Sequence, residues 1–437
     1  MRSFEVLEDR QMLTVSLVSD INTQPADSDI QFVASLDDVE IFLADDGIHG
    51  RELWRTDGTT VGTYRLLEQD LAGWSVKAAV ATQQVFLLIE AQGVGDVLYV
   101  SDGTANGTRR INELISLASS SIDTPVAVGD DVVFLSFDFD PAGRRIWRTD
   151  GSVEGTHSIS TDVLPQGSSQ VVWGIGGTAL LYAGNAGRQL LALHSEDKQT
   201  VLLSEFPSPS SLDSFTSFGE TALFVARVGG VTELWTTDGT RTGTFKLASI
   251  RNIQTLTKIG DHIYFVGNDG IHGNEVWRTD GTVDGTAMVR DIAPGFPGST
   301  VLSCCGFGAV GDRIVFSATN SEFGNQVWGT DGTEVGTEVL TNTQDGAFNA
   351  TALVEWNGFV YFAGRVGQVW RTDGTPQGTE FVTEVSPGFR VEELIVAGEQ
   401  LVVLAREPGA NDFRHPGLGC QFGTSKFFVT GVPRDKR

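Results

Sequence analysis

Two glycine-rich stretches carry the residues best suited to metal chemistry. Residues 45–50 read Asp-Asp-Gly-Ile-His-Gly, and residues 268–273 read Asn-Asp-Gly-Ile-His-Gly. Carboxylate oxygens and imidazole nitrogens are common metal ligands, and each stretch places one of each three residues apart. The candidate ligands are Asp46, His49, Asp269 and His272. The alternative is a hairpin loop that simply persisted when a repeat was duplicated.

Motifs typical of catalysis are absent from the sequence. The six histidines fall in no His-Glu-x-x-His cluster, and no Gly-x-Ser-x-Gly elbow, phosphate loop or dinucleotide fingerprint occurs. Enzymes that cleave sugars use pairs of carboxylates, and the 56 acidic residues single out no such pair. We therefore assign no catalytic residue and expect a non-enzymatic protein. A carbohydrate-active hydrolase or lyase is the alternative, and a convergent carboxylate pair with raised pKa values near a central channel would favour it.

One motif recurs along the chain and organises it. It reads aromatic-x-x-Asp-Gly-Thr-x-x-Gly-Thr, first at Trp54, Asp57 and Gly58. Later copies are Tyr99 with Asp102, Trp147 with Asp150, Trp235 with Asp238, Trp277 with Asp280, Trp328 with Asp331, and Trp370 with Asp373. A degenerate copy is expected near Leu191, because the gap between Trp147 and Trp235 spans two periods. The mean spacing of the aromatic positions is about 45 residues.

Each repeat has the pattern of four short strands. Two apolar runs flank a Gly-Asp or Asn-Gly turn, as in 256–266 and 352–362, and the motif supplies a third strand with a fourth after it. Four strands per repeat of this length predict an all-β fold, a single β-propeller of four-stranded antiparallel blades. The eight complete repeats are expected near 30–70, 71–112, 122–162, 168–204, 212–249, 252–292, 300–341 and 348–385.

The two ends of the chain suggest how such a ring closes. Residues 14–21 resemble a fourth strand, whereas 391–405 and 426–430 resemble the first three strands of a blade. Together they would form a ninth blade from 391–431 and 14–21, so that one propeller covers 14–431. The alternative is eight blades with these strands as appendages. Residues 1–13 are interpreted as an N-terminal tail or sorting-like segment.

The repeated residues themselves favour structural roles. The tryptophan that occupies one strand position in six of the repeats is expected to pack between blades rather than to form a sugar platform. The aspartate is expected to accept backbone hydrogen bonds in a turn for which the following glycine supplies a positive φ. Calcium needs six to eight oxygens, and one aspartate per turn supplies too few. We expect no cofactor, with calcium as the alternative.

Charge and cysteine content limit the partners. The formal net charge of −26 opposes binding to nucleic acid and to anionic membrane surfaces. The sequence contains no apolar run of about 18 residues, so we expect no transmembrane helix. Cys304, Cys305 and Cys420 are interpreted as buried side chains, with a bridge from Cys420 to one of the other two as the alternative.

The motif also resembles that of a known family. The Glu-Leu-Trp-x-Thr-Asp-Gly-Thr-x-x-Gly-Thr stretches at 52–63 and 233–244 resemble the bacterial ELWxxDGT repeat family, over about residues 30–385. Residues 4–13 are similar to the LEPRxLL motif of exported bacterial proteins, with Asp9 in place of its proline and Met12 in place of its first leucine. An ordinary N-terminal tail is the alternative for this segment. The resemblance implies a secreted or cell-surface protein, although the chain shows no signal peptide of the usual kind.

A ligand is expected on one face of the ring. The turns between the first and second strands, and between the third and fourth, are nearly uniform, whereas the other connections vary in length and chemistry. Function usually resides in variable loops on a rigid scaffold. The candidate residues of this variable-loop face are Asp46, His49, Asp138, Asp140, Asp269, His272, Asn320 and Glu322. We expect a protein or polysaccharide partner there, a purely structural spacer being a further alternative, and we assign no oligomeric state.

Overall fold

The computed structural model describes most of the chain as β-strands. The described residues are 15–17, 21, 28–91, 95–111, 121–137, 144–159, 168–184, 187–194, 200–208, 210–294, 306–341, 350–364, 367–385, 390–397, 400–406 and 425–430. These residues contain no helix, so none that could cross a membrane.

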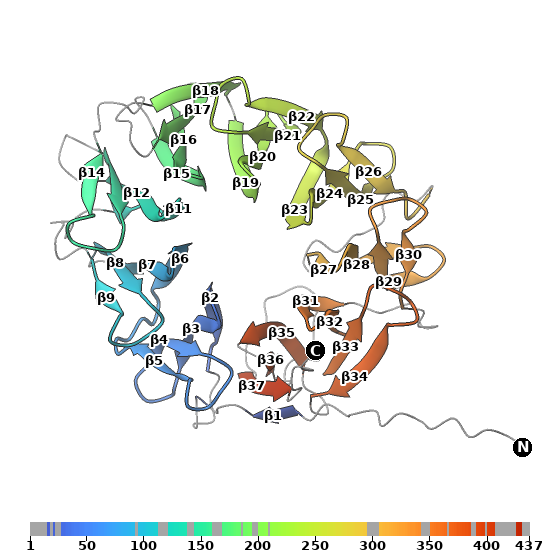
Figure 1. The fold of residues 1–437 in the computed structure, drawn as a ribbon, viewed down its shortest axis with the longest axis horizontal. Coiled ribbons are helices and arrows are strands. Elements are labelled where there is room, and N and C mark those ends of the chain that lie inside the picture. Colours follow the sequence, from blue (N-terminus) through green and yellow to red (C-terminus); the bar gives the residue numbers. More distant parts are fainter. Residues whose placement is uncertain are drawn as a thin grey trace, which may run out of the picture.

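Eight antiparallel sheets are built from strands consecutive in sequence and surround a common axis (Figure 1). Blade 1 comprises β2 (Gln31–Leu36), β3 (Val39–Asp45), β4 (Arg51–Thr56) and β5 (Tyr64–Leu67). Blade 2 comprises β6 (Ser75–Ala81), β7 (Gln84–Ala91), β8 (Gly95–Ser101) and β9 (Arg109–Arg110). Blade 3 comprises β10 (Ser121–Ile122) and β11 (Val126–Val128), which both pair with β12 (Asp131–Phe137), then β13 (Arg144–Thr149) and β14 (His157–Ile159). Blade 4 comprises β15 (Ser168–Ile175), β16 (Thr178–Gly184), β17 (Gly187–His194) and β18 (Thr200–Pro207).

The remaining four of these sheets follow the same order. Blade 5 comprises β19 (Ser210–Phe218), β20 (Thr221–Val228), β21 (Val231–Thr237) and β22 (Phe245–Ser249). Blade 6 comprises β23 (Arg251–Ile259), β24 (His262–Asn268), β25 (Asn274–Thr279) and β26 (Ala287–Arg290). Blade 7 comprises β27 (Gly308–Val310), β28 (Arg313–Asn320), β29 (Gly324–Thr330) and β30 (Glu338–Val339). Blade 8 comprises β31 (Thr351–Trp356), β32 (Phe359–Ala363), β33 (Gln368–Thr372) and β34 (Glu380–Glu384).

A further sheet joins the two ends of the chain. It contains β35 (Arg390–Ala397), β36 (Gln400–Arg406), β37 (Ser425–Thr430) and, as its outermost strand, β1 (Val15–Leu17). The N-terminal strand pairs antiparallel with the last strand, with Val15 opposite Thr430 and Leu17 opposite Phe428. The predicted all-β propeller is therefore confirmed, and the N-terminal strand completes an additional sheet between blades 8 and 1, called blade 9 below.

The register of the second and third strands explains the repeated tryptophan. In blade 1 Phe42 lies opposite Trp54, and in blade 5 Phe224 lies opposite Trp235. At the corresponding position of blade 4, Leu181 lies opposite Leu191. The degenerate copy expected near Leu191 thus has the strand pairing of the intact motifs, with leucine in place of the tryptophan.

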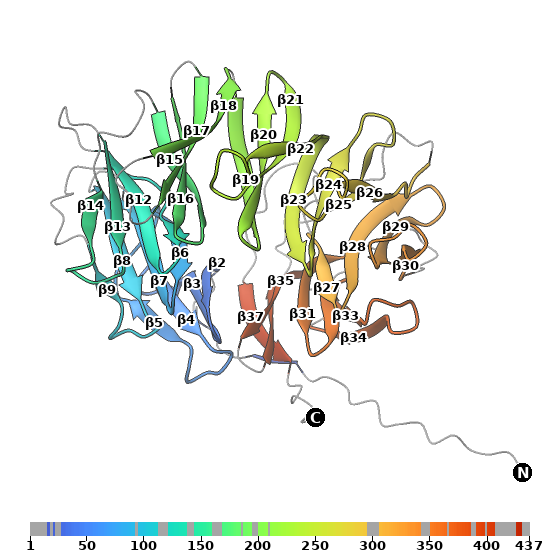
Figure 2. The ribbon, with the colours of Figure 1, turned by 45° about the horizontal axis from the view of Figure 1, so that its top comes forward.

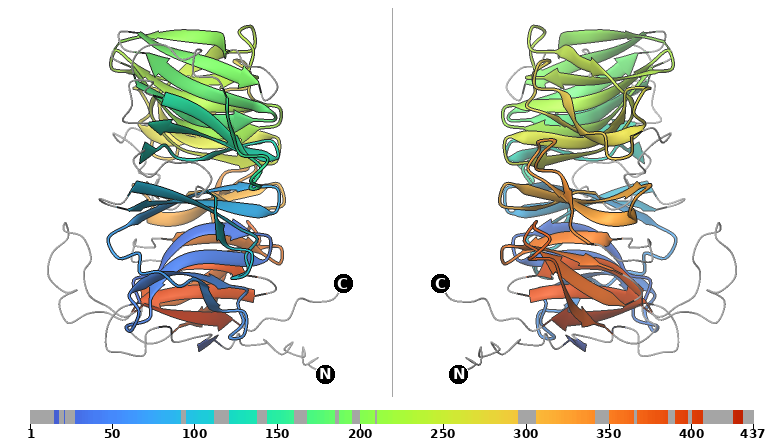
Figure 3. Two further views of the ribbon diagram at one scale, coloured as in Figure 1. Left: turned by 90° about the vertical axis from the view of Figure 1, so that its left-hand side faces the viewer. Right: turned by 90° about the vertical axis from the view of Figure 1, so that its right-hand side faces the viewer.

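Neighbouring blades share hydrophobic cores all the way round the ring. One core contains Leu43 of blade 1 with Leu87 of blade 2, and another contains Leu180 of blade 4 with Phe224 of blade 5. Phe42 packs with Val402 of β36, which joins blade 9 to blade 1. Burying apolar area between blades is worth about 25 cal/mol per Å². In edge-on views these stacked sheets form a disc (Figure 3).

The Asp-Gly-Thr turn is held by a hydrogen-bond network, shown most completely in blade 5. Oδ1 of Asp238 accepts bonds from the Thr240 amide (2.8 Å) and hydroxyl (2.7 Å), and the same hydroxyl oxygen accepts the Gly243 amide at 3.0 Å. The hydroxyls of Thr237 and Thr244 lie 2.7 Å apart. Gly239 has φ of +83°. The turn is thus satisfied from within the chain.

The second glycine of the motif is required by contact with the aspartate. A Cβ atom at Gly243 would overlap the carboxylate of Asp238, and the equivalent glycines of the other intact motifs meet the same obstacle. We predict that Gly243→Ala destabilises the protein by about 1–3 kcal/mol, because overpacking forces neighbouring groups to shift. Denaturant unfolding of wild type and variant measures this change.

Asp238→Ala tests whether the carboxylate causes the loss of stability expected for Gly243→Ala. It removes the carboxylate, so Gly243→Ala should cost less in an Asp238→Ala background than in the wild type. Equal costs in both backgrounds would show that the carboxylate is not the obstacle.

Candidate functional site: the variable-loop face

The first Asp-Gly-Ile-His-Gly loop connects β3 to β4 and is closed by one carboxylate. Oδ1 of Asp46 accepts the amides of Ile48 (2.9 Å) and His49 (2.8 Å), and its Oδ2 lies 2.7 Å from Nδ1 of His49. Burial acts to raise the pKa of Asp46, but these hydrogen bonds outweigh it and lower the pKa to about 2. The carboxylate is therefore ionised throughout the physiological range, and it fixes both the turn and the imidazole.

The second loop, between β24 and β25, repeats this geometry. Oδ1 of Asp269 accepts the amides of Ile271 (2.8 Å) and His272 (2.9 Å), and its Oδ2 lies 2.7 Å from Nδ1 of His272. Burial again opposes the effect of these bonds, yet the pKa of Asp269 falls to about 2. The Asp269 hydrogen bond is also the main reason that the pKa of His272 is raised. The two loops lie on well-separated blades, 1 and 6, of the ring (Figure 1).

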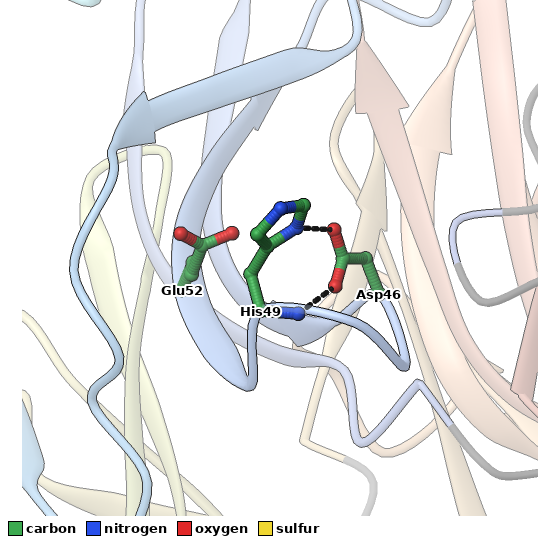
Figure 4. A group of neighbouring side chains, drawn as sticks. All are labelled: Asp46, His49 and Glu52. Carbon is green, nitrogen blue, oxygen red and sulfur yellow. Dashed lines mark hydrogen bonds and ion pairs between the residues drawn. The ribbon is translucent and has the colours of Figure 1, made fainter.

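Glu52 extends the first loop into a group with metal-ligand composition. The ligating atoms of Asp46, His49 and Glu52 lie within 4.8 Å of one another (Figure 4). However, Glu52 is 3% exposed and accepts an ion pair from Arg65 at 3.1 Å. Both Asp46 oxygens already receive hydrogen bonds. A cation beside Glu52 opposes a metal ion there, so the observed contacts fit a loop-stabilising network better than a metal centre.

The second loop lacks this arginine. In blade 1 Arg65 lies opposite Trp54 on the outermost strand. At the same position of blade 6, opposite Trp277, the residue is Met288. Glu275, the counterpart of Glu52, is fully buried, and its Oε2 accepts the Ile292 amide at 3.2 Å. The two copies therefore preserve the aspartate–histidine contact but give the buried glutamate different hydrogen-bond partners.

The other predicted residues are only partly brought together. Asn320 and Glu322 line a cavity of about 380 Å³ with Arg290 and Asp291. The charge of Asp291 also acts on His272, so blades 6 and 7 contribute neighbouring groups to one region. Asp138 and Asp140 lie outside the described residues, as do Cys304, Cys305, Cys420 and the tail 1–13.

The channel side of the ring contributes two groups that sequence reasoning did not select. Glu40 of β3 and Glu393 of β35 line one cavity of about 470 Å³, together with residues of β2 and β31. Burial raises the pKa of both carboxyl groups, and the Glu393 charge raises that of Glu40 further, against a lowering hydrogen bond from Ser35. A second cavity contains Trp173 and Phe215. Trp173 is a tryptophan outside the repeated motif. That position was the one signal in the sequence that could have drawn attention to this cavity.

Comparisons with known proteins report resemblance at the level of architecture. No family model matches the chain, and no curated protein matches it. A prolyl endopeptidase structure matches with 13% identity and a TM-score of 0.44, over 88% of this chain and 55% of that one. A puromycin hydrolase matches with 13% identity and a TM-score of 0.42, over 79% and 60%. BamB from Moraxella catarrhalis matches with 11% identity and a TM-score of 0.41, over 95% and 98%. The chain thus spans little more than half the length of the two hydrolases.

The aspartate–histidine contact predicts the titration of the second loop. Because the Asp269 carboxylate stabilises the imidazolium, the pKa of His272 should exceed the usual 6.5 in an NMR titration. The ion pair is then complete below about pH 6.5 and is lost as the pH rises through the folded-state pKa of His272. Asp269→Asn, which keeps an oxygen for the loop amides, should return the pKa toward 6.5.

Asp46→Asn is the matched control for this titration. It makes the same change in blade 1 and should leave the His272 pKa unchanged. A His272 pKa at or below 6.5 in the wild type contradicts the assignment.

Proposed function

We propose that the chain is a non-enzymatic binding propeller that recognises a protein or a polysaccharide through its variable-loop face. The observation that carries this proposal is the pair of matched loops at 45–50 and 268–273. Each is closed from inside by an aspartate, and each directs a large apolar side chain outward: Ile48 is 70% exposed and Ile271 is 81% exposed. Such an arrangement provides contact area on a rigid support.

Energetics supports a binding role for these loops. Fully burying an isoleucine side chain is worth about 1.5–3 kcal/mol. A loop already fixed by internal hydrogen bonds loses little conformational entropy when a partner binds. The ionised Asp46 and Asp269 are occupied in holding the loops, which favours display over acid–base chemistry at neutral pH.

We also propose a secreted or cell-surface location. Its support is the resemblance of the repeats to the ELWxxDGT family and of residues 4–13 to the LEPRxLL motif. The net charge of −26 disfavours polyanionic partners, so neutral polysaccharides and proteins with basic surfaces are the favoured ligands.

Replacement of the loops tests the proposed face. A glycan array, run with and without calcium, first identifies a carbohydrate ligand. Replacing 45–50 and 268–273 by Gly-Ser sequences should then abolish binding of that ligand, and Ile48→Ser with Ile271→Ser should weaken it at least tenfold. The thermal midpoint should stay close to that of the wild type.

A matched control uses exposed valines of the opposite connections. Val61 and Val335, in the Asp-Gly-Thr turns, are 91% and 96% exposed. Val61→Ser with Val335→Ser should leave binding unchanged. Binding that survives both loop replacements would show that the variable-loop face is the wrong surface.

A carbohydrate-active enzyme is the second candidate, and the Glu40–Glu393 pair favours it. Glycoside cleavage uses a pair of carboxyl groups beside one cavity, of which the general acid has a raised pKa, and burial raises the pKa of both Glu40 and Glu393. Against it, the partly buried aromatic groups that could hold a sugar lie on other blades, at β15 and β19. The pair is therefore separated from the best candidate platform.

Product analysis distinguishes this second candidate from the first. We expect no release of reducing ends from neutral polysaccharides by the wild type. Release that Glu393→Gln abolishes would instead establish the enzyme. Glu355→Gln, at an exposed residue of the same cavity, is the control that should retain such activity.

A further inference from the structure

A cavity of about 780 Å³ lies on the channel side of four consecutive blades. Its lining comes from β6, β15 and β19 and from residues 123–127, which include the first two residues of β11. These strands are the innermost of blades 2 to 5 and face the axis (Figure 1; β6, β15 and β19 also in Figure 2). The volume lies within the range of about 300–1,000 Å³ that is typical of small-molecule sites.

Two aromatic rings form a stacked pair in this cavity. The ring centroids of Trp173 and Phe215 are 6.3 Å apart, with an interplanar angle of 19°. Phe215 also stacks on the fully buried Phe224, with centroids 5.0 Å apart and an angle of 14°. Nε1 of Trp173 donates to the Ser217 hydroxyl at 3.1 Å. The partly buried pair is therefore anchored to the core of blade 5 and oriented by a hydrogen bond.

Trp173 is exceptional for its position in the repeat. It lies two residues before the end of the inner strand, as Ala79 does in β6, Val126 in β11 and Thr216 in β19. The register confirms this equivalence, because Trp173 pairs with Leu180 and Thr216 with Leu223, each two residues into the next strand. Blade packing alone accommodates small or β-branched residues there. A tryptophan facing a cavity requires a further explanation, and a ligand supplies one.

The backbone around the aromatic pair disfavours a peptide as that ligand. The pairing of β15 with β16 shifts register between Val171 and Trp173, and that of β19 with β20 shifts between Asp213 and Thr216. Ser214 within the second irregularity has φ of +56°. Bulges at an edge strand interrupt the backbone pattern that an added strand needs and re-aim side chains.

The polar groups of the cavity disfavour anionic ligands. Asp123, Gln170 and Asp213 belong to the lining, and the described lining residues include no lysine or arginine. Asp213 already pairs with Arg227, with N–O distances of 3.0 and 3.3 Å. The lining therefore offers a ligand amide, carboxylate and hydroxyl groups for hydrogen bonding. It offers no positive charge that would attract an anion.

We propose that this cavity binds a segment of a neutral oligosaccharide, whose C–H face stacks on Trp173, with Phe215 supporting that ring from behind, and whose hydroxyls bond to Gln170 and Asp213. An apolar ring face with hydroxyls at its rim matches a site that combines aromatic area with a few polar groups. The site is separate from the variable-loop face, so it extends the proposed function to a second surface and does not depend on it.

Binding measurements on the full chain test this site. Neutral hexasaccharides of glucose, mannose and xylose, the anionic oligogalacturonate, and a proline-rich peptide are titrated by calorimetry and by tryptophan fluorescence. We expect at least one neutral hexasaccharide to bind. Trp173→Ala should weaken it at least tenfold, while Trp173→Phe should retain part of the affinity because it keeps a stacking ring.

Phe381→Ala is the matched control. Phe381 is an aromatic residue, 47% exposed, on the outer strand β34, and its removal should not change sugar binding. Unchanged thermal midpoints separate loss of the site from loss of the fold.

The outcomes separate this site from the variable-loop face. Binding lost in Trp173→Ala but kept when 45–50 and 268–273 are replaced supports the cavity and shows that this sugar is not bound through the loops. The reverse pattern overturns the cavity. Absence of binding by every neutral hexasaccharide at millimolar concentration, or binding of the anionic sugar or the peptide alone, also overturns it.

Discussion

The burial of both faces of every blade is the constraint on which the rest of this molecule depends. A sheet with Phe42 and Leu43 adjacent in one strand presents apolar groups on both sides, and each side needs a partner. Neighbouring blades provide one for each other, so the stack must close on itself. The contact of Phe42 with Val402 and the pairing of β1 with β37 achieve that closure. The strands β1 and β37 are therefore structural parts of the ring.

The two faces of the ring differ in how strictly their connections restrict the sequence. The Asp-Gly-Thr turns satisfy their polar groups locally, and the contact between Asp238 and Gly243 leaves no space for another side chain at the glycine. The connections on the opposite face have no such common requirement. Even the two most similar ones, at 45–50 and 268–273, give the following glutamate different partners, Arg65 in one and the Ile292 amide in the other. Their shared aspartate–histidine contact is the part that fixes the loop.

The sequence was sufficient for the features that repeat. The spacing of Trp54 and its successors predicted the blades, and the gap between Trp147 and Trp235 located the copy at Leu191. The channel chemistry could not be predicted in this way. Glu40 and Glu393 are 353 positions apart in the numbering and come together only because the ring closes between blades 9 and 1. Trp173 and Phe215 belong to different blades, and each lies at a strand irregularity that strand periodicity does not reveal.

The channel wall consequently has two chemically distinct sides. Blades 4 and 5 contribute the aromatic pair, whereas blades 1 and 9 contribute the two carboxyl groups whose pKa values burial raises. Inner strands have an edge without a strand partner in their own sheet, so their side chains and backbone are the groups a ligand in the channel would meet. Packing between blades restricts the side chains of these inner strands less than it restricts those of the second and third strands. A residue such as Trp173 can therefore depart from the repeat without disturbing Phe224 and the core, which makes the inner edge a place where binding specificity can evolve on a fixed ring.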